Sequence, residues 1–164
     1  VVSISGLITM TGGKWTTYRK MGEDTIDQAI IVAGLDERIS STQFLPIHGH
    51  ASGPQMDDPL SAYGSDRAAI HKLIKANQDL AEKLHPDLNF IKAQVVWAVR
   101  EEMARTVEDV LARRVRALFL DSRAAIEMAP EVARLIAAEL NWNEEKTATE
   151  IKDFEKLAKG YMLK

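Results

Sequence analysis

The sequence of 164 residues contains no cysteine, which excludes disulfide bonds and cysteine-based metal or redox sites. It has no apolar run close to the roughly 20 residues that a membrane-spanning helix needs, and it shows no signal peptide. Neither sign of charge dominates, because the formal net charge is only −3. The composition therefore does not indicate nucleic acid or an acidic membrane as a partner for the chain as a whole, and the lack of cysteine fits a reducing cytoplasm.

Apolar residues are plentiful, since 46% of the chain is hydrophobic, enough to form a real core. The length corresponds to one medium domain, or to one domain plus a piece of another. The chain opens in strand-like residues without an initiator methionine. We therefore expect it to be a piece of a longer protein.

The first 40 residues predict a short β-hairpin followed by a helix. Val1–Ile4 and Leu7–Met10 are β-branched and apolar, and Ser5-Gly6 between them predicts a two-residue turn. The spacing of apolar residues predicts a helix over Tyr18–Ala33 that ends at Gly34. Two strands alone are marginal in water. We therefore expect this region to be poorly ordered, folded onto the rest of the chain, or paired with another copy.

Residues 41–64 are rich in proline and glycine and predict a linker, in which Gln43–Ile47 form a short extended piece. Residues 65–164 have a helical pattern throughout. The fold class predicted is thus mainly α: an all-α C-terminal cap domain of about five helices, preceded by the β-hairpin, the first helix and the linker.

Capping residues and prolines divide the helical region. We expect aromatic residues on its apolar faces to lie in the core, together with an inward-facing Met103. The expected caps and breaks are Ser65, which caps a helix running to Pro86; a helix over Lys92–Ala104; Thr106; Asp121 or Ser122; a new helix starting at Pro130; and Asn143. The expected core aromatics are Trp97, Phe119, Trp142 and Phe154.

The strongest local signal is Gly12-Gly13-Lys14, which stands between the second expected strand and the first helix. Glycine allows positive φ and close approach of another molecule, and a helix start presents unpaired N–H groups with a partial positive charge. With Thr16 and Thr17 as possible caps, such a corner suits a phosphate or carboxylate. The alternative is a tight turn beside a solvated lysine.

Two separated blocks of sequence resemble one enzyme family. The first is Ser5-Gly6-Leu7-Ile8-Thr9 followed by Gly-Gly-Lys-Trp-Thr-Thr-Tyr-Arg-Lys, and the second is Ala98–Arg114, closing with Phe119-Leu120-Asp121. In this order and spacing they resemble the carboxyl-terminal third of the FAD-dependent, aerobic glycerol-3-phosphate dehydrogenases. The glycerol-3-phosphate oxidases share these blocks and differ in the electron acceptor.

The resemblance implies specific roles for the glycine corner. Lys14 would be a catalytic residue beside the flavin and the substrate, and Gly12, Gly13, Lys14, Trp15 and Thr16 would contact the FAD. Residues 1–40 would be a remnant of the FAD and substrate domain. The whole enzyme would oxidise sn-glycerol 3-phosphate to dihydroxyacetone phosphate and pass electrons to quinone. It would act in the cytoplasm, peripherally at the inner face of the membrane.

The chain also lacks parts that such an enzyme needs. The G-x-G-x-x-G fingerprint for a dinucleotide is absent, as are the family's upstream substrate-binding arginines and histidine. We therefore expect the chain alone to bind no FAD and to be inactive, with an upstream FAD domain as its partner. The alternatives are a helical docking or dimerisation module without its own chemistry, and an oxidase that uses oxygen.

Other charged or metal-binding patterns are weaker. Arg113-Arg114-Val115-Arg116 lacks interleaved aromatics and lies among acidic residues, so we discount nucleic acid. His48 and His50 have no third ligand nearby, so we expect no metal site.

The dense charge of the second block has two interpretations. Pairs four residues apart, Glu101 with Arg105 and Asp109 with Arg113, predict ion pairs within a helix. Alternatively, part of the network is buried between helices and fixes how they pack.

Overall fold

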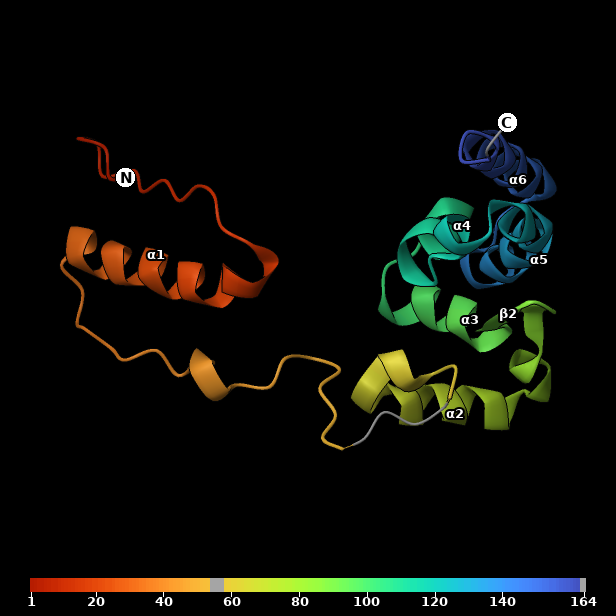
Figure 1. The fold of residues 1–164 in the computed structure, drawn as a ribbon, viewed down its shortest axis with the longest axis horizontal. Helices are drawn as coiled ribbons and strands as arrows, with labels where there is room; N and C mark the ends of the chain where they lie inside the picture. Colours follow the sequence, from red (N-terminus) through yellow and green to blue (C-terminus); the bar gives the residue numbers. More distant parts are fainter. Residues whose placement is uncertain (54–57, 163–164) are drawn as a thin grey trace. The chain divides into compact units, whose positions relative to one another are not determined.

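The computed structural model describes residues 1–53 and 58–162, so part of the predicted linker, residues 54–57, lies outside the described residues. The chain divides into two compact units, Val1–His48 and Gly49–Lys164, which are described separately (Figure 1). The prediction of a mainly helical fold is confirmed. The predicted assignment of residues 1–40 to an FAD domain stays a prediction.

The first unit contains one long helix. A 3-10 turn, η1 (Trp15–Thr17), leads into α1 (Tyr18–Ala33), and a second 3-10 turn, η2 (Thr42–Phe44), follows. As predicted, α1 ends at Gly34, which has φ 63° and is left-handed. The predicted extended piece over Gln43–Ile47 is wrong in its first part, because Thr42–Phe44 forms η2.

The predicted hairpin at the start of the chain is reduced to one antiparallel bridge, Val2 with Ile8. Its turn also differs from the prediction. The Ser3 carbonyl accepts a hydrogen bond from Gly6 N–H at 3.0 Å, and the Ser3 hydroxyl accepts one from Leu7 N–H at 3.0 Å. The loop therefore has three residues, Ile4 to Gly6, and Gly6 takes the left-handed position with φ 82°. Because the Ser3 side chain bonds within the turn, the two-residue Ser5-Gly6 turn does not form.

The first unit buries little of its apolar surface. No residue of α1 is buried, and side chains such as Trp15 and Ile31 are 87% and 70% exposed. The apolar residues of this unit therefore have no extensive cover within residues 1–48.

The second unit is built around α5 (Ser122–Leu140), which packs against α3 (Lys92–Glu101), α4 (Ala117–Leu120) and α6 (Glu144–Lys159), as Figure 1 shows. One continuous cluster of buried apolar side chains joins these helices. The other elements are η3 (Ser61–Asp66), α2 (Arg67–Ala76), η4 (Gln78–Ala81), β1 (Lys83–His85), β2 (Leu88–Ile91) and η5 (Asp109–Arg114), which is π-helical.

Residues 83–91, predicted as helix and inter-helix sequence, form a β-hairpin instead. β1 and β2 are antiparallel, and His85 pairs with Leu88 across Pro86 and Asp87. The predicted helix up to Pro86 already ends at Ala76, because Asn77 is extended with φ −143° and ψ 103°. The Asn77 side chain then accepts a hydrogen bond from Asp79 N–H and caps η4. The hydrogen bond of the Asn77 side chain therefore ends the helix before Pro86 is reached.

Two further boundaries differ from the prediction. Ser65 does not cap α2, because it lies inside η3 beside Gly64, whose φ of 53° and ψ of −119° kink the backbone. Helix α3 ends at Glu101, and Met103 has φ 58° and is 77% exposed. The prediction that Met103 faces inward is therefore wrong.

Helix α5 runs through Pro130, so the predicted new helix at this position is wrong. Proline removes one backbone donor from the ladder, but Met128 and Val132 on either side are fully buried and hold both halves in the core. The predicted caps Asp121 and Asn143 are confirmed, since each side chain accepts hydrogen bonds from its helix's first turn.

The aromatic predictions are mostly confirmed. Trp97 and Phe154 are buried, at 9% and 2% exposed, and Trp142 packs partly buried against the core. Phe119 is the exception, because it is 54% exposed. The backbone explains this: Arg116 has φ 60° and breaks the helix, so α4 does not continue the face set by Val110 and Leu111.

Thr106 and Asp109 cap the start of this helical segment reciprocally, each side chain accepting a hydrogen bond from the other residue's N–H group. The Asp109 N–H donates to Thr106 Oγ1 at 3.0 Å, and the Asp109 carboxylate accepts N–H bonds from Arg105 at 2.9 Å and Thr106 at 3.1 Å. Burial alone would raise the pKa of Asp109, but these hydrogen bonds and nearby Arg113 outweigh burial and lower it.

We expect Asp109→Asn to lower the free energy of unfolding by about 1 kcal/mol at pH 7, because one good acceptor is lost at a cap. A depressed pKa stabilises the fold above the ordinary value of 3.8, and this stability is lost as pH falls through the folded value. Urea unfolding at pH 7 and pH 3 should therefore show a smaller gap between wild type and variant at pH 3. Glu108→Gln, which alters an exposed ion pair, is the control, and a gap that widens in acid would contradict the argument.

Candidate functional site

The five residues predicted to form the site lie in one turn that leads into α1. Gly12 and Gly13 have φ of 84° and 96°, a region that side chains other than glycine rarely adopt. Lys14 is extended, with φ −136° and ψ 161°, and Trp15 and Thr16 begin η1. All five are exposed within residues 1–48. The structure thus gives them one continuous, accessible surface, which we name the glycine corner (residues 12–16).

Thr17 closes the glycine corner internally. Its hydroxyl accepts a hydrogen bond from Lys14 N–H at 2.9 Å and lies 3.0 Å from the Lys14 carbonyl oxygen, to which it donates. The prediction that Thr16 or Thr17 caps the helix by its side chain is therefore wrong, because neither hydroxyl accepts a hydrogen bond from the first turn of α1.

Lys14 and Trp15 are the side chains that project from the corner. The Trp15 ring lies 5.6 Å from the Tyr18 ring, with an interplanar angle of 32°. Among the described residues, Lys14 forms no ion pair, whereas Lys20 on α1 pairs with Glu23 at 2.6 Å and Asp24 at 2.9 Å. The corner therefore combines a full positive charge with the start of a helix, and this chemistry suits an anion.

The two glycines differ in what surrounds them. A Cβ on Gly13 would lie 2.1 Å from Met21 Sδ, whereas a Cβ on Gly12 would meet nothing within 4 Å. Gly12 therefore leaves open space in which another molecule can approach the backbone, and Gly13 lets the turn fold against α1. These features fit one wall of a cofactor or substrate pocket. They do not form a whole one, since no other element of residues 1–48 faces them with a second set of polar groups.

We expect Gly13→Ala to disturb α1 more than Gly12→Ala does. Both variants strain a left-handed position by about 1 kcal/mol, but only Gly13→Ala must also displace Met21. Hydrogen exchange of the amides in the first turns of α1 should therefore be faster in Gly13→Ala than in Gly12→Ala. Adding Met21→Ala to Gly13→Ala should recover part of the protection, and equal exchange in the two single variants would contradict this account.

The charged block of the second unit shows both arrangements anticipated from the sequence. Asp109 and Arg113 form the predicted pair at 3.0 Å. Arg105 instead donates to the backbone carbonyls of Val99 at 2.9 Å and Ala104 at 2.7 Å, so the predicted pair with Glu101 is replaced.

Between helices, Glu150 of α6 is 9% exposed and accepts the Val107 N–H at 3.2 Å. Arg114 contacts Glu102, whose pKa is raised by burial. The first contact joins α6 to the segment that precedes η5, and the second joins η5 to the residue that follows α3, so the block has a structural role.

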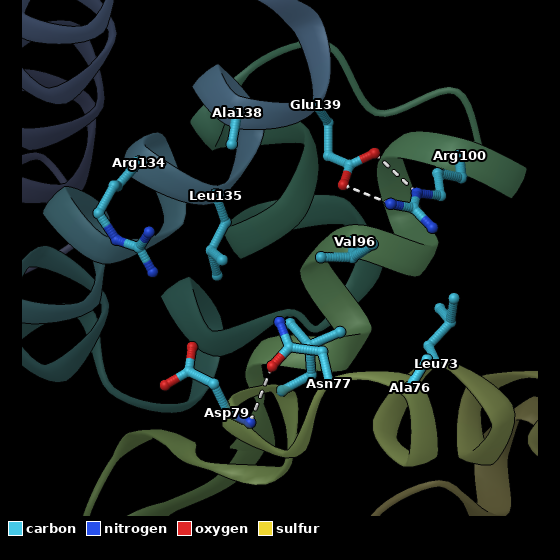
Figure 2. A pocket seen from close by; sticks show the side chains of 11 residues that line it. Leu73, Ala76, Asn77, Asp79, Val96, Arg100, Arg134, Leu135, Ala138 and Glu139 are labelled. Atoms are coloured by element: carbon cyan, nitrogen blue, oxygen red, sulfur yellow. Dashed lines mark hydrogen bonds and ion pairs between the residues drawn. The ribbon is translucent and has the colours of Figure 1, made fainter.

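A cleft of about 300 Å³ in the second unit was not anticipated from the sequence (Figure 2). Leu73, Val96 and Leu135 supply apolar walls, and its charged side chains are paired: Arg100 with Glu139 at 2.7 Å and Arg134 with Glu131 at 2.6 Å. Because these charges are neutralised within the unit, the cleft presents no activated group.

Two other clusters have ordinary partners. Glu23, Asp24 and Asp27 bring carboxylate oxygens within 4.8 Å of one another, and Lys20 neutralises two of them. The His85 ring has two acidic neighbours: Glu127 on α5, at 3.1 Å, and Asp87, at 4.0 Å. Among the described residues, no helix is long and apolar enough to cross a membrane.

The chain combines a glycine corner in its first unit with a mainly helical second unit. These two features define its class of protein, and the comparison with known proteins agrees with that class. Residues 7–147 match the family described as the C-terminal domain of alpha-glycerophosphate oxidase, and the chain belongs to that family. No solved structure matches the chain.

The curated relatives are named as dehydrogenases. The chain is 37% identical over 163 residues to a probable mitochondrial glycerol-3-phosphate dehydrogenase of Caenorhabditis elegans, covering 87% of this chain and 22% of the relative. It is 34% identical to the mitochondrial glycerol-3-phosphate dehydrogenase of Rattus norvegicus, over 92% of this chain and 23% of the relative. The human enzyme is 32% identical over 88% of this chain and 23% of the relative. The chain thus spans less than a quarter of the length of these relatives, and the resemblance noted from the sequence is confirmed.

Proposed function

We propose that this chain is the C-terminal part of an FAD-dependent glycerol-3-phosphate dehydrogenase. The whole enzyme oxidises sn-glycerol 3-phosphate to dihydroxyacetone phosphate and passes the electrons to quinone. The observation that carries the proposal is the match of 87–92% of this chain to dehydrogenases more than four times its length. The chemistry of the glycine corner also supports the proposal, because the corner is exposed and Lys14 forms no ion pair with any residue that the structure describes.

FAD, when bound by the whole enzyme, would supply the hydride acceptor for the oxidation of carbon 2 of the substrate. The residues of this chain supply one wall of that site. Lys14 holds its ammonium group toward the substrate, where it neutralises the phosphate or the charge on the reacting oxygen. Gly12 and Gly13 let the backbone approach the flavin closely, and Trp15 and Thr16 pack beside it.

Location and partners follow from the same proposal. The relatives are named mitochondrial, and we propose peripheral contact of the whole enzyme with the inner face of a membrane, on the cytoplasmic side in a cell without mitochondria. Quinone is the electron acceptor and glycerol 3-phosphate the substrate, and the upstream FAD domain belongs to the same polypeptide. A homodimer is compatible with this arrangement.

The test compares the longer polypeptide with residues 1–164 alone. The longer protein should carry a flavin absorbance band and reduce a soluble quinone analogue when glycerol 3-phosphate is added. Residues 1–164 alone should show neither the band nor the activity. Flavin bound to the short chain would contradict the proposal that the corner is only one wall of the site.

An oxidase is the second candidate, because the matching family is described by alpha-glycerophosphate oxidase. The two enzymes use the same substrate chemistry and differ in where the electrons go. Peroxide formed in proportion to glycerol 3-phosphate consumed, without a quinone, would identify an oxidase.

A further inference from the structure

The second unit exposes few large apolar side chains among its described residues. Met103, Phe119, Leu120 and Tyr161 are the ones that are more than half exposed, and three of them are neighbours. The Phe119 and Tyr161 rings meet edge to face, with centroids 5.6 Å apart and an angle of 78°. Leu120, which is 66% exposed, follows Phe119 at the end of α4. We name Phe119, Leu120 and Tyr161 the Phe119 patch.

The Phe119 patch borders a hollow of about 370 Å³. Leu118, Leu120, Ser122 and Tyr161 contribute to its walls, together with Arg123. A hollow beside fixed aromatic rings is the shape that receives a protruding side chain of another protein, and Phe, Tyr, Met and Arg are the residues enriched in such interfaces.

The charge around the patch is positive, although the whole chain carries a net charge of −3. The Arg116 guanidinium lies 5.8 Å from the centroid of the Phe119 ring, and Arg123 lines the hollow. Asp121 also lines the hollow and contributes one negative charge, and its Oδ1 accepts the N–H groups of Arg123 and Ala124 at 2.9 and 3.1 Å, so the two arginines outnumber a single carboxylate at the patch. The complementary surface is therefore apolar at its centre and acidic at its edge.

We propose that the Phe119 patch is the docking surface for an acidic segment of the longer polypeptide, outside residues 1–164. An apolar side chain of that segment fills the hollow, and its carboxylates pair with Arg116 and Arg123. This inference rests on the proposed function, because the relatives are more than four times longer than this chain and supply the occupant. The inference adds to the proposed function the surface by which the helical unit is held to the rest of the polypeptide.

The test uses the absence of cysteine in residues 1–164. Leu120→Cys is introduced into the longer polypeptide and into the short chain, and its labelling by a maleimide is followed by mass spectrometry of the peptide that contains it. Ala148→Cys, at an exposed position on α6, is the matched control. Leu120→Cys should label about tenfold more slowly in the longer polypeptide than in the short chain, because docking covers the thiol. The control should label at the same rate in both.

A charge reversal tests the acidic character of the occupant. Arg123→Glu, added to Leu120→Cys in the longer polypeptide, should restore fast labelling, whereas Lys152→Glu at an exposed position of α6 should not. Hydrogen exchange of the α4 amides in the unsubstituted proteins gives the same comparison without a new thiol. Slower exchange in the longer polypeptide is the expected result.

Each other outcome overturns the inference. Equal labelling in both proteins means that nothing outside residues 1–164 covers the patch, and protection that rises with protein concentration assigns it to a second copy. Protection only with vesicles of anionic phospholipid assigns it to a membrane. Because labelling is read independently of dehydrogenase activity, an active enzyme with an open patch removes only this inference, and an inactive protein with a protected patch removes only the proposed function.

Discussion

Replacing Lys14 by methionine in the longer polypeptide should lower kcat/KM for glycerol 3-phosphate by about 100-fold or more. Methionine keeps most of the length and apolar stem of lysine but removes the charge that we propose faces the substrate. A charge that acts on a phosphate or a developing oxyanion inside a closed site contributes about 10²–10³-fold to the rate. Among the described residues this lysine has no carboxylate partner, so its charge is available for that purpose. Steady-state kinetics with a quinone analogue measures the effect.

Lys20→Met is the matched control, because Lys20 is also an exposed lysine of the first unit but pairs with Glu23 and Asp24. We expect its kcat/KM to stay within about threefold of wild type, since an exposed ion pair contributes little. FAD content, measured by absorbance, should be the same in both variants and in wild type. A Lys14→Met enzyme with full flavin content and near-normal kinetics would show that Lys14 is only a solvated lysine beside a turn.

Sequence patterns located those helix ends where one side chain or one glycine determines the boundary. Gly34 ends α1 because its left-handed backbone suits no other residue as well, and Asp121 and Asn143 begin helices because their side chains accept the first N–H groups. These causes lie within a few residues of the boundary. They are therefore visible in the sequence itself.

The errors arise where the same local pattern has two solutions. Leu80 and Leu84 fit a helical spacing after Ile74, yet the backbone turns at Asn77 and residues 83–91 pair as strands. Pro86 predicts a helix stop, whereas Pro86 and Asp87 connect β1 to β2. Short apolar runs cannot distinguish a helix from a strand by spacing alone.

At Pro130 and Phe119, tertiary structure overrides the prediction made from the local sequence. A proline predicts a break, but the buried side chains around it keep α5 continuous. An aromatic residue on an apolar face predicts burial, but the left-handed Arg116 turns α4 so that Phe119 is exposed. Neither outcome follows from a local propensity.

The sequence predicted where the glycine corner lies, but it did not predict the hydrogen bonds within it. Five consecutive residues between an extended segment and a helix must lie together, and glycine, lysine and a helix start identify the chemistry. The sequence did not show that Thr17 bonds back to Lys14, because a threonine hydroxyl can serve either the helix or the turn. In the proposed enzyme, the opposite wall of the pocket is supplied by residues outside this chain.

Phe154→Ala should lower the free energy of unfolding of the helical unit by about 3–5 kcal/mol, the usual cost of removing a large buried aromatic side chain. Phe154 lies on the inner face of α6, is 2% exposed, and belongs to the apolar cluster that joins α6 to α5. Alanine would leave a cavity between these helices, which cannot close easily because Ala158, one turn further along, is already small and fully buried. Urea unfolding, followed by circular dichroism, measures the change in midpoint.

Phe119→Ala is the control with the same chemical change at an exposed site. In residues 1–164 alone we expect it to cost no more than about 1.5 kcal/mol, since it removes the ring contact with Tyr161 but no buried volume. The two variants together separate the roles that the sequence assigned equally to both phenylalanines. Equal losses of stability would mean that Phe119 is buried in solution and that the Phe119 patch is closed without any partner.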